Sequence, residues 1–270
     1  MLSFLPTPIG NLGDISFRTI EVLKDGEYIL CEDTRVTKKL LSLISSKYNI
    51  DFPNFTFLSV HSHNEKEFLI ASNIELLKNK NCIYMSDAGM PCVSDPGAIL
   101  VEYCLENGIK YEVIPGANAI LTAYASSGFS HTSFTFFGFL PHKGRSRESQ
   151  LEDILKNTHL SILYESPHRL LKLLKELNEK VPNRSIFLIK EITKKYETRY
   201  KNSTTNIYNL LKNEDIKGEW VVIIEPIETT GENLTVDDIK DLKLPPKQKA
   251  KLLSKLTGQN IKDIYNNLIE

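Results

Sequence analysis

The stretch CIYMSDAGMPCVSDPG, residues 82–97, decides the fold, because it joins a predicted strand to a predicted helix through a long loop. The loop, residues 86–97, contains two glycines, two prolines, two aspartates and two serines. A plain connection between a strand and a helix takes about two to six residues. Asp95 and Pro96 predict the start of the helix, as its N-cap and first helical residue. The loop is thus longer and stiffer than a plain connection requires.

Short apolar runs alternate with helical patterns through residues 1–117, which predicts a parallel sheet with helices on both faces. One of these helices is expected to run unbroken through residues 63–80. Residues 118–228 combine strand-like runs with short connections that suit antiparallel pairing, so we expect a second α/β domain with a mixed sheet. A polar, turn-rich linker is expected to begin at residue 227. Residues 234–270 then form an appendage of two short helices, too small to hold a core alone. The expected fold class is α/β, with two domains and this small helical C-terminal appendage.

The composition is that of an ordinary globular protein. The 270 residues are 41% hydrophobic and 25% charged, and the formal net charge is −1. Without a global basic field, a nucleic-acid partner must meet a local basic surface. No stretch approaches the roughly twenty apolar residues that cross a membrane, and the N-terminus lacks the basic region of a signal peptide. We therefore expect a cytoplasmic protein with no membrane partner. The four cysteines form no C-x-x-C pair, so no metal site is expected.

Three turns rich in glycine or proline fall where predicted parallel strands end, at residues 6–14, 87–97 and 115–119. In open α/β sheets, ligands bind beyond the carboxyl ends of the strands, and glycine lets the backbone approach a ligand closely. One such turn is an ordinary connection, but three in consecutive register favour a shared ligand-binding crevice. The first turn lacks the third glycine of the dinucleotide fingerprint, and the chain has no G-K-[ST]. Both facts argue against a phosphate cradle.

Seven segments together closely resemble one family: PTPIGNLGDISFRTIEVLK, CEDTR, SDAGMPCVSDPG, PGANA, FFGFLP, YESPHR and KEITK. The family is the ribosomal small-subunit RNA (cytidine-2'-O)-methyltransferases, a branch of the tetrapyrrole-methylase superfamily. EDTR and YESPHR are typical of the RNA branch, and the resemblance runs from about Leu5 to the last helix. It implies a tetrapyrrole-methylase-like fold with S-adenosylmethionine in a cleft between two α/β domains. It also implies a homodimer whose substrate is the small-subunit RNA, either free or within the assembled small subunit.

The resemblance also implies, position by position, which residues bind the cofactor. The long loop is expected to wrap the methyl donor, and a second turn and the end of a strand in the second domain complete the site. The implied cofactor-binding residues are Pro8, Gly10, Asp87, Ala88, Gly89, Pro91, Val93, Ser94, Asp95, Pro115, Gly116, Ala117, Ala119, Tyr164 and Glu165. Met90 and Asn118 stand where many relatives carry threonine and serine, which changes one local hydrogen-bonding group at each position.

Methyl transfer to a ribose 2'-hydroxyl requires alignment and a group that takes the departing proton. The candidate catalytic residues follow two predicted strand ends: Glu32, Asp33 and Arg35 in the first half, and Lys190 and Glu191 in the second. One carboxylate is expected to act as base, and a cation to neutralise RNA phosphate. The alternatives are that Asp33 caps the following helix, that Glu32 is a salt-bridge partner, and that Glu191 belongs to a structural ion pair.

RNA contacts are predicted at two basic segments and one further arginine. Residues 143–147, KGRSR, directly follow GFLP, where RNA phosphates are expected to pass the rim of the cleft. Four lysines fall within residues 247–255 of the appendage. The predicted RNA-binding residues are Lys143, Arg145, Arg147, Arg169, Lys247 and Lys251. The alternative for both segments is an ordinary solvated surface.

These patterns and the resemblance predict an enzyme that methylates the 2'-oxygen of a cytidine in small-subunit ribosomal RNA. Two alternatives stay open from the sequence. A tetrapyrrole C-methyltransferase would share the scaffold, although such relatives usually lack EDTR and the appended helices. A non-catalytic ribosome-binding relative would also share the fold, although the intact cofactor loops argue against it.

Overall fold

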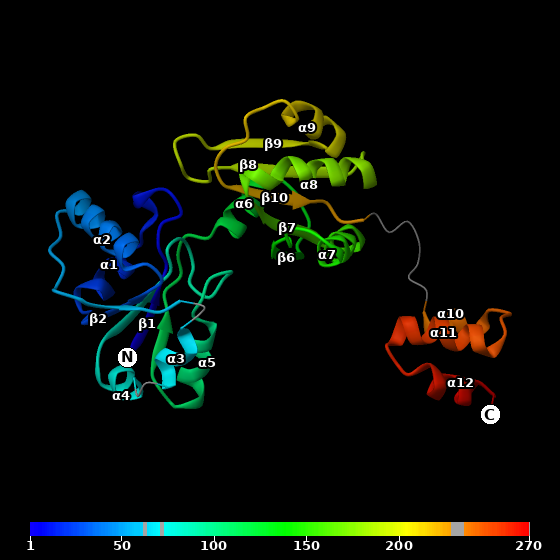
Figure 1. Ribbon diagram of the computed structural model, residues 1–270, viewed down its shortest axis with the longest axis horizontal. Helices are drawn as coiled ribbons and strands as arrows, with labels where there is room; N and C mark the ends of the chain where they lie inside the picture. The colour runs from blue at the N-terminus through cyan, green and yellow to red at the C-terminus, as the bar shows by residue number, and fades with distance from the viewer. Residues whose placement is uncertain (62–63, 71–72, 228–234, 270) are drawn as a thin grey trace. The chain divides into compact units, whose positions relative to one another are not determined.

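The computed structural model describes residues 1–61, 64–70, 73–227 and 235–269. Contacts divide the chain into two compact units, Met1–Ile227 and Glu228–Glu270 (Figure 1). Both predicted α/β domains fall within the first unit. The predicted boundary between residues 228 and 234 lies outside the described residues.

The first half of Met1–Ile227 is built on a parallel sheet of five strands in the order β3-β2-β4-β1-β5. The strands are β1 (Leu2–Leu5), β2 (Tyr28–Cys31), β3 (Thr56–Ser59), β4 (Cys82–Met85) and β5 (Tyr111–Val113). The three central strands, β2, β4 and β1, are buried almost throughout, as expected for parallel strands covered on both faces. The parallel sheet predicted for this half is confirmed.

Helices cover both faces of this sheet. The helices are α1 (Phe17–Lys24), α2 (Thr34–Tyr48), α3 (Glu65–Ile70), α4 (Ile74–Asn79) and α5 (Ala98–Glu106), with a 3-10 helix at Leu12–Asp14. Helices α1 and α2 cover one face and α3, α4 and α5 the other (Figure 1). Leucines of the first two helices pack in one core, and leucines of the other three pack in a second core. The single helix predicted over residues 63–80 is wrong in one respect, because the structure has two shorter helices, α3 and α4, in this stretch. Residues 71 and 72, between them, lie outside the described residues.

The second half carries a mixed sheet in the order β6-β7-β10-β8-β9. Its strands are β6 (Phe134–Phe139), β7 (Leu160–Glu165), β8 (Ser185–Lys190), β9 (Thr198–Ser203) and β10 (Trp220–Ile224). Only β6 and β7 run parallel, and the other three pairs are antiparallel, which confirms the predicted mixed sheet. The helices are α6 (Ala119–Ser127), α7 (Arg145–Lys156), α8 (Pro167–Lys180) and α9 (Thr204–Leu211).

The two faces of the mixed sheet bury different partners. Helices α7, α8 and α9 share one core with the first face. On the other face, Ile120 and Ala123 of α6 pack against the strands, and Ile9 and Val93 from the loops of the first half join them. Loops of the parallel sheet therefore reach the mixed sheet, and this contact positions the site described below.

Residues 235–269, the described part of the C-terminal unit, form three helices, α10 (Val236–Asp241), α11 (Pro246–Thr257) and α12 (Ile261–Ile269). The sequence predicted two helices here and a turn-rich linker where α10 lies. A capping box between Thr235 and Asp238 starts α10. Ile239, Ala250, Leu253 and Ile264 form a small buried cluster, so this unit does hold a core of its own. In the part of the chain that the structure describes, no helix has the length and apolar character to span a membrane.

Candidate functional site

The three predicted turns leave three adjacent strands, β4, β1 and β5. Thr7 and Gly89 join the first two turns through a pair of backbone hydrogen bonds, with N···O distances of 2.9 and 3.1 Å. The third turn approaches the first at Gly116, where an added Cβ would lie 2.3 Å from Cγ of Pro6. Glycine is therefore required at position 116 for the close approach of the two turns. The predicted convergence of the three turns at one sheet edge is confirmed.

The long loop has a backbone conformation that the sequence analysis did not predict. Gly89, Cys92, Ser94 and Gly97 all have positive φ, between 66° and 119°. Helix α5 begins at Ala98 with Gly97 as N-cap, so the prediction of Asp95 and Pro96 as helix start is wrong.

The cap of α5 comes instead from α3. The buried Glu65 carboxylate accepts hydrogen bonds from the N–H groups of Gly97 and Leu100, both at 3.1 Å. A carboxylate at a helix N-terminus satisfies free donors and the helix dipole together. Asp95 is therefore not the cap of α5; its side chain hydrogen-bonds with Ser86, and the residue lines a cavity.

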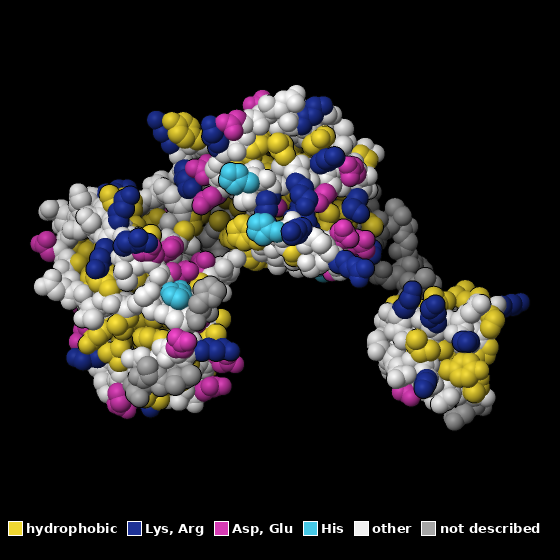
Figure 2. Space-filling view, viewed as in Figure 1, with side chains coloured by type: hydrophobic (Ala, Val, Ile, Leu, Met, Phe, Trp, Pro, Cys, Tyr) yellow, Lys and Arg dark blue, Asp and Glu magenta, His cyan; other side chains and the backbone are white. Residues whose placement is uncertain are grey.

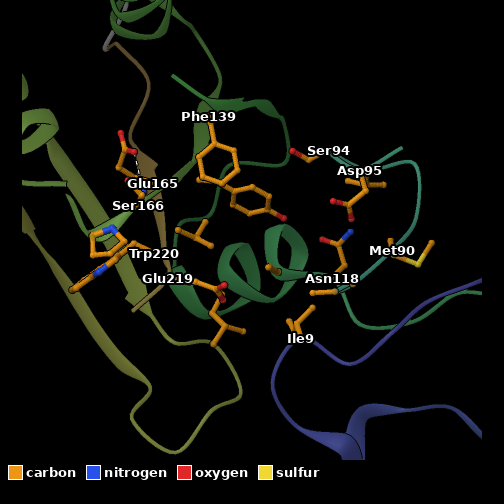
Figure 3. A pocket seen from close by; sticks show the side chains of 18 residues that line it. Ile9, Met90, Ser94, Asp95, Asn118, Phe139, Glu165, Ser166, Glu219 and Trp220 are labelled. Carbon is orange, nitrogen blue, oxygen red and sulfur yellow. Dashed lines mark hydrogen bonds between the residues drawn. The ribbon is translucent and has the colours of Figure 1, made fainter. Parts of the chain in front are cut away.

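A cavity of about 430 Å³ lies between the loops of the parallel sheet and the mixed sheet. Figure 3 shows Ser94, Asp95 and Asn118 on one side and Phe139, Glu165 and Trp220 on the other. Eight of the predicted cofactor residues line it: Ala88, Gly89, Val93, Ser94, Asp95, Ala119, Tyr164 and Glu165. Both positions where the sequence departs from its relatives, Met90 and Asn118, also line the cavity.

The other predicted cofactor residues do not line the cavity: Pro8, Gly10, Asp87, Pro91, Pro115, Gly116 and Ala117. Gly10 has φ +149°, and an added Cβ would lie 2.4 Å from Cγ of Lys194 in the mixed-sheet half. Because Gly10 has no side chain, the backbone of the first half can pack closely against Lys194 of the second half. Glu165 lines the cavity without exposing its side chain, whose exposed fraction is 0%. A contact between the Glu165 carboxylate and a cavity ligand is therefore ruled out in this arrangement.

Three carboxylates gather where β2 and β4 end side by side. The backbone N–H of Asp87 donates to Glu32, and that of Asp33 donates to Asp87. Burial raises the pKa of Glu32 and of Asp87. Burial and the charges of Glu32 and Asp87 raise the pKa of Asp95 to about 6. Of the three, only Asp95 lines the cavity.

Asp33 and Arg35 adopt the alternative arrangement that the sequence left open. Asp33 is the N-cap of α2 and accepts from the Arg35 N–H at 2.8 Å. Its carboxylate also pairs with the Arg35 guanidinium at 2.7 Å. The Asp33 pKa falls to about 2 because of the hydrogen bonds from Arg35, which makes this carboxylate a poor proton acceptor. The Arg35 side chain is 89% exposed and open to an external anion.

Lys190 and Glu191 lie away from the cavity lining. Lys190 lines a second cavity of about 220 Å³ and lies over the Trp220 ring at 5.8 Å. Glu191 pairs with Lys194 at 3.0 Å and accepts from the N–H of Glu219 at 2.9 Å. Burial raises the Glu191 pKa, but these hydrogen bonds outweigh burial and lower it overall. Glu191 is therefore a structural ion-pair partner here.

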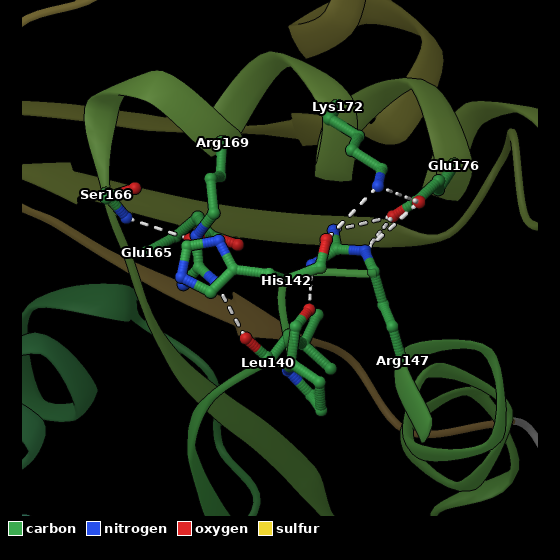
Figure 4. Close-up of polar contacts among 9 residues, drawn as sticks. Leu140, His142, Arg147, Glu165, Ser166, Arg169, Lys172 and Glu176 are labelled. Atoms are coloured by element: carbon green, nitrogen blue, oxygen red, sulfur yellow. Dashed lines mark hydrogen bonds and ion pairs between the residues drawn. The ribbon is translucent and has the colours of Figure 1, made fainter. Parts of the chain in front are cut away.

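Two of the predicted RNA-binding arginines are corrected by the structure (Figure 4). Arg147 is 2% exposed, pairs with Glu176 at 2.7 Å and donates to the Pro141 carbonyl at 3.0 Å. Arg169, 14% exposed, pairs with Glu165 at 2.7 Å and donates to the Leu140 carbonyl at 2.8 Å. Both guanidinium groups are held by carboxylates and backbone carbonyls of the chain itself, so neither is free to pair with an RNA phosphate.

The remaining predicted RNA-binding residues, Lys143, Arg145, Lys247 and Lys251, are exposed. Figure 2 shows basic and acidic side chains interspersed over the drawn face of Met1–Ile227, in agreement with the near-neutral net charge. On the drawn face of the C-terminal unit, basic side chains lie beside hydrophobic ones.

The cavity lining includes several residues that sequence reasoning missed, and most lie in the second half. These are Ile9, Phe139, Ser166, Pro167, Ile192, Glu219, Trp220 and Val221. The available signal was their place at strand ends: Trp220 starts β10 and pairs in register with Glu165 at the end of β7. No group of histidine, cysteine, aspartate or glutamate among the described residues is arranged to hold a metal ion.

Residues 1–208 match the family of tetrapyrrole (corrin/porphyrin) methylases. The chain is 51% identical over 270 residues to ribosomal RNA small subunit methyltransferase I of Campylobacter fetus, with all of both chains covered. It is 39% identical over 226 residues to the protein of that name in Bacillus subtilis, which covers 83% of this chain and 75% of that one.

Two solved structures show the same fold at low sequence identity. A diphthine synthase has a TM-score of 0.61 at 14% identity, with 83% of this chain and 89% of that chain covered. A uroporphyrin-III C-methyltransferase from Thermus thermophilus, complexed with S-adenosyl homocysteine, has a TM-score of 0.56 at 15% identity, with 82% and 96% covered.

Proposed function

This chain belongs to the tetrapyrrole methylase family and, within it, to the ribosomal RNA small subunit methyltransferases I, and from that premise we propose its reaction. The chain transfers the methyl group of S-adenosylmethionine to the 2'-oxygen of a cytidine in small-subunit ribosomal RNA. The observation that carries this proposal is that YESPHR, a segment typical of the RNA branch, contributes four residues to the cavity lining, in a chain 51% identical to a named rRNA methyltransferase along its full length.

The cavity suits the methyl donor in size and lining. Binding sites for ligands of this size are mostly apolar clefts of about 300–1,000 Å³ with a few convergent polar groups. The cavity of about 430 Å³ combines apolar walls from the mixed sheet with Ser94, Asp95 and Asn118 from the loops. Gly89 and Ala88 present backbone with little or no side chain to a ligand. When bound, the donor supplies an electrophilic methyl group on a sulfonium.

The protein's part in the reaction is alignment and proton transfer. Asp95 has a pKa of about 6, so it is mostly ionised at neutral pH yet basic enough to take a proton. Glu32 and Asp87, whose pKa values are also raised, lie near enough to Asp95 for their negative charges to raise its pKa. The proton acceptor is therefore this carboxylate group, with Asp95 at the cavity and Glu32 and Asp87 behind it. Arg35, exposed next to it, is placed to contact RNA phosphate.

The remaining features of the proposal concern partners and location. The chain acts as a homodimer in the cytoplasm, and Lys143, Arg145, Lys247 and Lys251 supply local phosphate contacts. The exposure of these four side chains supports the phosphate contacts. Because the net charge of the chain is near neutral, affinity for RNA must come from such local patches.

Methyl transfer in vitro tests the proposed function. The full chain is incubated with S-adenosylmethionine labelled in the methyl group and with small ribosomal subunits from cells that lack the protein. The RNA is then digested to nucleosides. We expect label in 2'-O-methylcytidine alone. Label in a base-methylated nucleoside, or none in RNA, contradicts the proposal. Free ribosomal RNA serves as the second substrate and shows whether the assembled particle is required.

A further inference from the structure

We propose that Phe139 is the stacking platform on which an unstacked nucleobase of the RNA substrate rests at the mouth of the cavity. This inference rests on the proposed function, since it needs an RNA substrate. Phe139 lines the cavity and is 55% exposed, an unusual state for a phenylalanine that ends a strand. Figure 3 shows its ring at the border of the cavity, projecting from the end of β6.

A β-bulge turns Phe139 toward the cavity. Phe136 pairs with Ile162, but Phe139 pairs with Tyr164. Between these two pairs β6 advances by three residues and β7 by two, so β6 contains one extra residue. Phe136 faces the cavity side of the sheet and Phe137 the opposite side, so strict alternation would turn residue 139 away from the cavity. The extra residue reverses that alternation.

Gly138 makes the bulge possible. Its φ is +65°, a backbone conformation that favours glycine. An added Cβ would meet nothing within 4 Å, so glycine is needed here for the backbone conformation and not for close packing. As a result the Phe139 ring lies 5.4 Å from the Tyr164 ring, on the same face as Phe136.

The buried Arg147 and the partly buried Arg169 then fix the backbone that follows the ring. Arg169 donates to the Leu140 carbonyl and Arg147 to the Pro141 carbonyl, at 2.8 and 3.0 Å. Each arginine is itself held by a carboxylate, Glu165 and Glu176 respectively (Figure 4). The platform therefore does not need to be ordered by its ligand, which lowers the entropic cost of binding. Arg147 and Arg169 act as positioning residues for Phe139.

Arg169 lies over the Phe139 ring at 5.9 Å from its centroid, yet the residue stays more than half exposed, which suits a base of RNA better than a ring of the cofactor. Among the aromatic residues of the cavity lining, Trp220 is 3% exposed and Tyr164 is partly buried, whereas Phe139 is more than half exposed. Enzymes that act on an RNA nucleotide recognise single-stranded bases by stacking them on aromatic side chains. The exposed cations Lys143 and Arg145 follow the platform directly in the chain, where the phosphates of such a strand need partners.

Four variants of the full chain test the platform. Phe139→Ala removes the ring, Phe139→Leu keeps an apolar side chain without an aromatic face, and Phe139→Trp keeps the face. Phe17→Ala is the matched control, because it removes a ring that is 86% exposed at the start of α1, away from the cavity lining. Each variant is measured for its Kd for S-adenosylhomocysteine by calorimetry. Its kcat and KM for methyl transfer to small subunits from cells that lack the protein are also measured.

We expect kcat/KM for the small subunits to fall about 5- to 100-fold in Phe139→Ala and Phe139→Leu, as loss of one stacked base predicts. Phe139→Trp and Phe17→Ala should stay within about twofold of wild type, and all four variants should keep the wild-type Kd for S-adenosylhomocysteine. An equal loss of S-adenosylhomocysteine affinity in Phe139→Ala would assign the ring to the cofactor and overturn the inference. Wild-type kinetics in Phe139→Leu would also overturn it. Absence of transfer by the wild-type chain would instead refute the proposed function.

Discussion

At the scale of a single residue, the ionised carboxylate of Asp95 lowers the stability of the fold and is expected to contribute to ligand binding. Its pKa is raised to about 6 by burial and by the charges of Glu32 and Asp87, from 3.8 in an unfolded chain. Between these pH values the folded state holds a proton that the unfolded state has lost. Stability therefore falls as pH rises from about 4 to about 6. Above pH 6 the folded protein carries the full cost of the ionised carboxylate.

Asp95→Asn removes that cost. We expect the free energy of unfolding at pH 7 to rise by about 1–2 kcal/mol, a value reduced from the full pKa shift because Asp95 is only half buried. The gain should vanish at pH 3, below both pKa values, where Asp95 of the wild type is mostly protonated in both states. The same variant should lose affinity for the cationic S-adenosylmethionine more than for the neutral S-adenosylhomocysteine. Urea unfolding at both pH values and calorimetry with both ligands check this; a variant less stable than wild type at pH 7 would contradict it.

Gly89→Val tests the cofactor loop at the position where backbone lines the cavity. The residue has φ +86°, and an added Cβ would lie 3.2 Å from Cγ2 of Ile9, which also lines the cavity. We expect loss of detectable S-adenosylhomocysteine binding by calorimetry and a loss of about 1–3 kcal/mol in stability from the strained backbone. Gly108→Val is the control, since Gly108 has φ +61° with open space around it. It should lose similar stability and keep ligand affinity; unchanged affinity in Gly89→Val would remove this loop from the site.

At the scale of an element, the segment that follows Phe139 carries one buried arginine and one exposed lysine that we propose to contact RNA. Arg147 and Lys143 lie four residues apart, yet one is buried in an ion pair and the other is exposed. We expect Arg147→Met to lower stability by about 2–4 kcal/mol and to reduce kcat/KM without changing the salt dependence of RNA binding. Lys143→Ala should leave stability unchanged and reduce the slope of log K against log salt by about one. Thermal unfolding and binding titrations over a salt series check both predictions. A reduced slope of log K against log salt in Arg147→Met would show that Arg147 contacts RNA phosphate after all.

The same element shows what a sequence pattern predicts and what it does not. Strand ends rich in glycine and proline predicted the loops around the cavity, because local backbone preferences fix such turns. The burial of Arg147 depends on Glu176, 29 residues further along, and the helix cap of α5 comes from Glu65, 32 residues before Gly97. Contacts of this range depend on how helices pack, which periodicity and spacing do not specify. The bulge at Gly138 likewise depends on pairing with β7.

At the scale of the whole molecule, the proposed function places catalysis in Met1–Ile227 and part of the particle binding in Glu228–Glu270. Met1–Ile227 contains the cavity and every one of the residues that line it, whereas Glu228–Glu270 has its own small core. We expect a chain that ends at Ile227 to keep wild-type affinity for S-adenosylhomocysteine and to bind small subunits more weakly at low salt. The difference should shrink at high salt, because phosphate contacts are screened there.

The control for the shortened chain is the full chain with Lys247→Ala and Lys251→Ala. This double variant should reproduce part of the loss and reduce the salt slope by about two. Binding titrations of the three proteins against small subunits at several salt concentrations make the comparison. Equal affinity of the shortened and full chains at every salt concentration would show that the C-terminal unit takes no part in particle binding.

The central claim is that this chain places a methyl group on the 2'-oxygen of a cytidine in small-subunit RNA. Mass spectrometry of that RNA, from cells with and without the protein, tests it most directly. The account predicts a 2'-O-methylcytidine that disappears when the protein is removed and returns when it is restored, with every other modified nucleoside unchanged. An identical set of modified nucleosides in both RNA samples, or loss of a base methylation instead, would contradict it.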